Sequence, residues 1–125
     1  MAIIWDSVEV LKANDEFQTA IIEAITIFAA LSVVLVLIYL KSKYPKMTKK
    51  GFTELIVGFF IFAGHFLFDL LDTLVQKKIN GVTVQAYYTF DTLDAVLSFI
   101  GLFMIAFAFI RIANFGMELW EGKDK

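Results

Sequence analysis

Histidine and aspartate side chains recur at helical spacing inside apolar stretches of the chain. The stretch HFLFDLLDTL contains His65, Asp69 and Asp72, and the pattern F-D-x-L-D returns with Asp91 and Asp94. Residues three and four apart share one face of a helix, so His65, Asp69 and Asp72 could act together. A histidine nitrogen and two carboxylates can bind a metal ion or exchange protons. The spacing alone is a weak metal signal, because helical periodicity produces it whenever three polar residues share a face.

The sequence around these residues is typical of an integral membrane protein. Of its 125 residues, 59% are hydrophobic and 19% are charged, and its mean hydropathy is +0.75. The apolar residues form three runs of about twenty, long enough as helices to cross roughly 30 Å of hydrocarbon. We therefore expect an all-α membrane protein with three transmembrane helices. The absence of Cys excludes thiolate chemistry, and the net charge of −2 argues against nucleic-acid binding.

Local signals set the expected boundaries of a single transmembrane domain over residues 1–125. Residues 1–13 are predicted to form a short N-terminal interfacial helix, and helices about 15–43, 49–79 and 89–113 are predicted to span the membrane. The connecting loop KSKYPKMTKKG is rich in lysine and has no acidic residue, so the positive-inside rule places it in the cytoplasm. The expected topology is N-out and C-in, in a multi-pass protein of the cell membrane. Asn80-Gly81 predicts either a helix C-cap or a tight turn.

Each predicted span has one face of polar or small residues. On the second span this face contains Gly58, Phe62, His65, Asp69, Asp72 and Gln76, and on the third it contains Asp91, Asp94, Ser98, Gly101, Ile105 and Ala108. The first span contributes Glu23. Small residues let helices approach closely, so we expect the three faces to meet in a compact bundle. That bundle would gather an acidic cluster in the outer half of the membrane: Glu23, His65, Asp69, Asp72, Asp91 and Asp94.

The two copies of F-D-x-L-D differ in what they predict. Asp91 and Asp94 fall at the start of the third predicted helix, where a carboxylate interacts favourably with the helix dipole, so we interpret them as first-turn caps. Asp69 and Asp72 fall toward the C-terminal end of the second helix, where the dipole is unfavourable. Capping cannot account for that pair.

An ionisable group at membrane depth costs at least a few kcal/mol, so these groups should be protonated, paired, hydrated or metal-bound. The alternatives are a metal held by His65, Asp69 and Asp72, a shared proton, Lys77 or Lys78 folding back, and a basic residue from another subunit. We favour an interhelical polar core or a subunit contact over a metal site or an ion pathway.

With this layout, the chain resembles a small three-helix subunit found with archaeal ammonia monooxygenase, often called subunit X. The resemblance rests on the size, the three-helix plan, and the motifs KYPKMTKKGF, GHFLFDLLDTL, FDTLDA and FGMELWEG. It implies a non-catalytic structural or assembly subunit that packs as a hetero-oligomer against larger membrane subunits. In that family the enzyme is copper-dependent and the copper is attributed to the partner subunits. The resemblance therefore implies no cofactor in this chain and no ligand role for His65, Asp69 or Asp72.

Other functions compete with this interpretation. A small oligomeric ion, metal or proton transporter would use the intramembrane Asp/His cluster, and a membrane sensor would need a separate output partner. The sequence has no nucleophile–base pair and no phosphate-binding glycine loop, and its predicted external loops are too short to build a soluble active site. We expect no catalytic residues in this chain.

Overall fold

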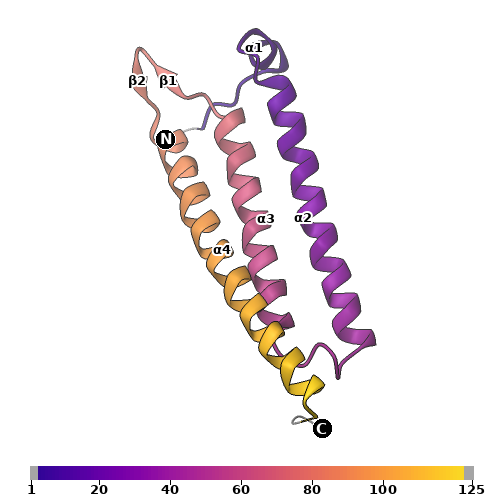
Figure 1. The fold of residues 1–125 in the computed structure, drawn as a ribbon. Helices are drawn as coiled ribbons and strands as arrows, with labels where there is room; N and C mark the ends of the chain where they lie inside the picture. Colours follow the sequence, from indigo (N-terminus) through magenta and orange to yellow (C-terminus); the bar gives the residue numbers. More distant parts are fainter. Residues whose placement is uncertain (1–2, 123–125) are drawn as a thin grey trace.

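Three long helices lie side by side, with α3 between α2 and α4 (Figure 1). The computed structural model of the chain describes residues 3–122. Its elements are α1 (Val8–Ala13), α2 (Phe17–Lys43), α3 (Phe52–Leu74), β1 (Lys78–Ile79), β2 (Val82–Thr83) and α4 (Gln85–Trp120). Each of α2, α3 and α4 is long and apolar enough to cross a membrane, as predicted from the sequence.

The helices form an open row, and the predicted compact bundle is wrong. α3 packs against both neighbours, whereas α2 and α4 make at most slight contact with each other. One small core joins the row, made by Leu37 of α2, Leu55 of α3 and Ala108 of α4. Much of the remaining helix surface is apolar and exposed, as at Phe103, which is 63% exposed. The polar faces predicted from the sequence indicate which sides of neighbouring helices meet, but α2 and α4 do not come together to complete a bundle.

α2 ends as predicted and α3 ends earlier than predicted. Pro45 disfavours a helical conformation at the residue before it, and α2 stops at Lys43. The second helix was expected to reach residue 79, yet α3 ends at Leu74 because Val75 is extended. Val75 is fully buried and forms an antiparallel bridge with Trp5.

The N-terminal segment is only partly helical. α1 covers Val8–Ala13, and Ser7 caps it by accepting a hydrogen bond from the amide of Val10. The chain before α1 pairs with the end of α3: the Asp6 amide donates to Leu74 and the Gln76 amide donates to Ile4, both at 2.8 Å. Residues 1–2 of the predicted interfacial helix lie outside the described part of the chain.

A short hairpin connects α3 to α4. Its strands pair Lys78 with Thr83 and Ile79 with Val82. Asn80 and Gly81 have φ angles of 52° and 79°, so the Asn-Gly pair forms the tight turn of this hairpin. This resolves the two alternatives for Asn80-Gly81 in favour of the turn.

The start of α4 corrects the interpretation of Asp91 and Asp94. The third helix was expected to begin at about residue 89, but α4 begins at Gln85 and has no acidic residue in its first turn. Asp91 and Asp94 therefore lie inside the helix, where they cannot serve as first-turn caps. α4 also extends to Trp120, beyond the predicted end at residue 113.

Candidate functional site: an acidic cluster between α3 and α4

Three aspartates from two helices converge near one end of the row. Asp69 and Asp72 come from α3 and Asp94 comes from α4, and one carboxylate oxygen of each lies within 4.8 Å of the other two. Asp72 is buried, with 9% of its surface exposed, while Asp69 and Asp94 are half-buried. We call these three residues the aspartate cluster. Three of the four aspartates in the two F-D-x-L-D copies therefore belong to the cluster.

Close packing of α3 on α4 brings the cluster together. A Cβ atom added at Gly58 of α3 would lie 3.1 Å from the main-chain nitrogen of Ile105 on α4. One added at Gly101 of α4 would lie 2.9 Å from the Phe62 ring and 3.3 Å from the Gly58 oxygen. The two backbones therefore approach closely where both helices carry glycine. The predicted contact between these two small-residue faces is confirmed.

His65 binds the aspartate cluster from one side. Its Nδ1 lies 3.2 Å from the main-chain oxygen of Asp94 and also contacts the Asp94 carboxylate. Because a main-chain oxygen only accepts, we assign the hydrogen to Nδ1. The rings of Phe62 and Phe66 lie 4.9 Å and 4.8 Å from the imidazole, centroid to centroid. His65 thus holds Asp94 in place in an aromatic environment. The sequence predicts a candidate metal site of His65, Asp69 and Asp72, whereas the group that comes together in the structure has Asp94 in place of His65.

Glu23 and Asp91 lie outside the aspartate cluster. The hydroxyl of Thr73 on α3 lies 2.9 Å and 3.0 Å from the two carboxylate oxygens of Glu23 on α2. The same hydroxyl lies 3.1 Å from the main-chain oxygen of Asp69. Asp91 is exposed on α4. Glu23 therefore joins α2 to α3 beside the cluster, and Asp91 has no hydrogen bond or ion pair with any residue from 3 to 122.

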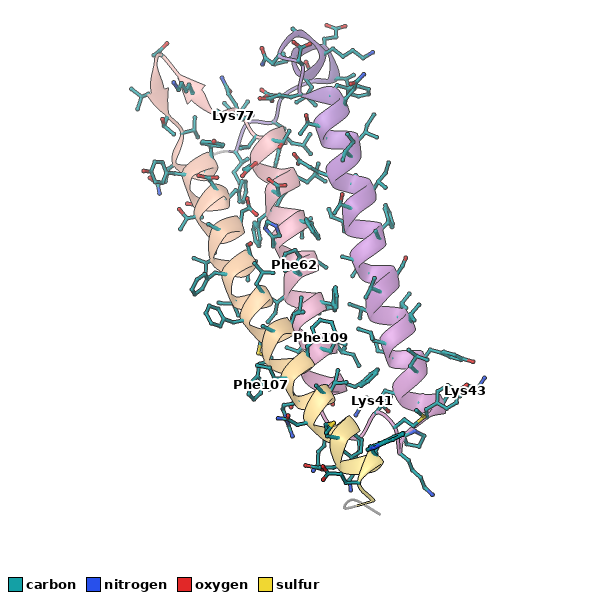
Figure 2. The ribbon with its side chains drawn as sticks, in the orientation of Figure 1. Lys41, Lys43, Phe62, Lys77, Phe107 and Phe109 are labelled. Carbon is teal, nitrogen blue, oxygen red and sulfur yellow. The ribbon has the colours of Figure 1, made fainter. Side chains whose placement is uncertain are left out.

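The nearest lysine does not neutralise the aspartate cluster. Lys77 lies 3.0 Å from the Glu16 carboxylate and 3.0 Å from the main-chain oxygen of Thr73. Figure 2 places Lys77 near the hairpin end, whereas Lys41 and Lys43 lie at the opposite end of the row. Within residues 3–122, no lysine or arginine forms an ion pair with the three aspartates. His65 is their only basic partner in this part of the chain.

A second set of charges joins α3 and α4 at the other end, and the sequence interpretation missed it. Arg111 of α4 pairs with Glu54 of α3, and Lys50 lies 2.9 Å from Glu118. The sequence does contain a signal for the pair of Arg111 and Glu54. Glu54 lies near the start of one span and Arg111 near the end of an antiparallel span, so the two residues fall at the same depth along the helices.

The searches for related proteins returned no match among family models, curated proteins or solved structures. The function of the chain therefore has to be inferred from its own residues.

Proposed function

We propose that this chain is a non-catalytic structural subunit of a larger integral-membrane complex. The open row of helices is the observation that carries the proposal. α3 packs on both sides, but α2 and α4 leave each other almost untouched, so three helices enclose little interior of their own. Helices associate in membranes by close packing and by interhelical hydrogen bonds, and wide unpaired faces are suited to such contacts.

The polar groups of the chain support a structural role. Three side-chain pairs join one helix to another: His65 to Asp94, Thr73 to Glu23, and Arg111 to Glu54. Connections outside the helices are short, and the hydroxyl of Thr73, which donates to the Glu23 carboxylate, lies at the contact between α2 and α3. These contacts fix the relative positions of the helices, as expected of a subunit with a structural role.

The resemblance to the archaeal ammonia monooxygenase subunit suggests which complex this is. The partners are the larger membrane subunits of an archaeal, copper-dependent ammonia monooxygenase, and copper belongs to those subunits. We place the chain in the cell membrane with its N-terminal segment and hairpin outside and the lysine-rich loop and C-terminus in the cytoplasm, following the positive-inside rule.

Purification from native membranes tests the proposal. A tag at the C-terminus avoids the N-terminal segment that pairs with Val75, and a mild detergent preserves helix contacts. We expect the 14.2 kDa chain to migrate in a much heavier native complex, together with larger membrane proteins in fixed ratio. Recovery of only a stable monomer or small homo-oligomer would refute the proposal.

Replacing exposed phenylalanines with another apolar residue distinguishes helix faces that contact a partner protein from faces that contact only lipid. Phe28 on α2, Phe60 on α3 and Phe103 on α4 are 72%, 62% and 63% exposed. Replacing each with Leu keeps an apolar surface that lipid accepts but changes the shape that a packed interface requires. We expect at least one of the three replacements to reduce recovery of the partners. Unchanged recovery with all three would mean that these faces touch lipid only.

The aspartate cluster favours a second candidate, a small oligomeric transporter of an ion, metal or proton. Carboxylates inside a span are typical of ion and proton pathways. Reconstituted vesicles would show flux that Asp69→Asn with Asp72→Asn abolishes, while the exposed-site control Asp91→Asn preserves it. Flux equal to wild type in the double variant would exclude this candidate.

A further inference from the structure

We propose that the carboxylates of Asp69, Asp72 and Asp94 bind one divalent cation that prefers oxygen ligands, with Ca²⁺ and Mn²⁺ as the representative ions. The site would lie between α3 and α4 within the membrane-spanning part of the chain. The inference concerns this chain alone and does not depend on its role as a subunit.

Asp72 is the first reason to expect a ligand. It is more than nine-tenths buried, and its carboxylate is directed at the other two carboxylates of the aspartate cluster. It makes no hydrogen bond or ion pair with any residue from 3 to 122, whereas buried polar groups in proteins are almost always partnered. A buried carboxylate without a partner costs considerable free energy, and a bound cation removes that cost.

The spacing of the three oxygens fits a single ion. All three lie within 4.8 Å of one another. Ligands of Ca²⁺ lie about 2.3 to 2.6 Å from the ion, so two ligands on opposite sides are about 4.6 to 5.2 Å apart and adjacent ligands are closer. One ion can therefore reach all three carboxylates with little movement of the helices.

The donor atoms determine the class of cation. The aspartate cluster offers carboxylate oxygens, which suit Ca²⁺, Mg²⁺ and Mn²⁺ better than softer ions. The Nδ1 atom of His65 is already used by Asp94, so the imidazole holds a ligand in place, as such partners do around metal sites.

Charge and access favour an ion over other occupants. One histidine cannot balance three carboxylates, and Lys77 is held by Glu16. A lysine or arginine from a partner would have to pass its long side chain to Asp72, which the fold covers almost completely. A small ion reaches such a position more easily. Once bound, it would link α3 to α4 at the hairpin end, as Arg111 and Glu54 do at the other end.

A Mn²⁺ titration tests the inference, because Mn²⁺ shares the oxygen preference of Ca²⁺ and its free form is measured by electron paramagnetic resonance. The full chain in mild detergent, with the partners that it retains, is first stripped of metal with a chelator. We expect one Mn²⁺ bound per chain and its displacement by Ca²⁺. Asp72→Asn should lower the affinity at least about tenfold.

Asp91→Asn is the matched control. It removes the same charge from an exposed position on α4, outside the aspartate cluster, so it should lower the affinity for Mn²⁺ much less than Asp72→Asn does. Circular dichroism checks that each variant is folded, and Asp69→Asn replaces Asp72→Asn if the latter does not fold. Absence of saturable Mn²⁺ binding to the wild-type chain overturns the inference. Equal losses in the cluster variants and the Asp91 control overturn it as well, because they would indicate general attraction to negative charge.

Discussion

His65 on α3 and Asp94 on α4 are joined twice, because the imidazole Nδ1 contacts both the carboxylate and the main-chain oxygen of Asp94, the latter at 3.2 Å. One ring therefore fixes both the position and the rotation of α4 against α3 beside the aspartate cluster. Asp94 belongs to the cluster as well, so the histidine determines where one of its three carboxylates lies.

Replacing His65 should destabilise the contact between α3 and α4. His65→Phe keeps an aromatic ring beside Phe62 and Phe66 but leaves the Asp94 carboxylate unpaired. Leaving one partner of this partly buried pair unsatisfied costs about 1 to 3 kcal/mol of unfolding free energy. Denaturation in detergent, followed by circular dichroism, measures this loss. Adding Asp94→Asn should recover part of it, since an amide carries no charge; no difference between the single and double variants would contradict this account.

The hydroxyl of Thr73 should matter more than its methyl group. Thr73→Val keeps the shape of the side chain but removes the donor to Glu23, leaving that carboxylate without a partner at the α2–α3 contact. We expect a loss of about 1 to 3 kcal/mol in unfolding free energy. Thr73→Ser retains the hydroxyl and is the control, so it should remain close to wild type. If Ser and Val cost the same, packing and not the hydrogen bond stabilises this contact.

Gly101 should tolerate no larger side chain. Gly101→Val places atoms against Phe62 and against the main-chain oxygen of Gly58, so α3 and α4 must move apart. Overpacking of this kind costs about 1 to 3 kcal/mol. The matched control is Gly116→Val on the same helix, because an added Cβ there meets nothing within 4 Å. Thermal unfolding in detergent compares the two, and equal melting temperatures would refute the close approach of the backbones.

The membrane orientation can be read with single cysteines, because the chain has no Cys of its own. Val82→Cys lies in the hairpin, where Val82 is 70% exposed, and Lys46→Cys lies in the lysine-rich loop. On intact cells, an impermeant maleimide should label the cysteine at position 82 and leave position 46 unlabelled until the membrane is opened. The reverse pattern would show that the chain has the opposite orientation.

The spans and part of the cluster followed from the sequence because they depend on local periodicity. Long apolar runs predict membrane helices, and small residues facing each other predict the contact at Gly58 and Gly101. The same periodicity placed Asp69 and Asp72 on one face. Periodicity could not predict where α2 lies around α3. A polar face shows which side of a helix makes contact, but it does not give the angle between the positions of α2 and α4 around α3.

The errors at the hairpin end have a physical origin in long-range contacts. Val84 precedes α4 without a side-chain cap, so no local signal marks the helix start at Gln85, and the sequence instead predicts a first turn that contains Asp94. The early end of α3 depends on pairing between Trp5 and Val75, which are distant in the sequence. No short motif predicts such a bridge.

The bridge between Trp5 and Val75 also has a consequence for the order of biosynthesis. Residues 4–6 leave the ribosome well before their partners at 74–76, which emerge only after two spans have been made. The Trp5 ring then stacks on Phe90 of α4, at 6.1 Å between centroids, so its last neighbour is made later still. Residues 4–6 thus complete their contacts only after the chain has been made as far as α4.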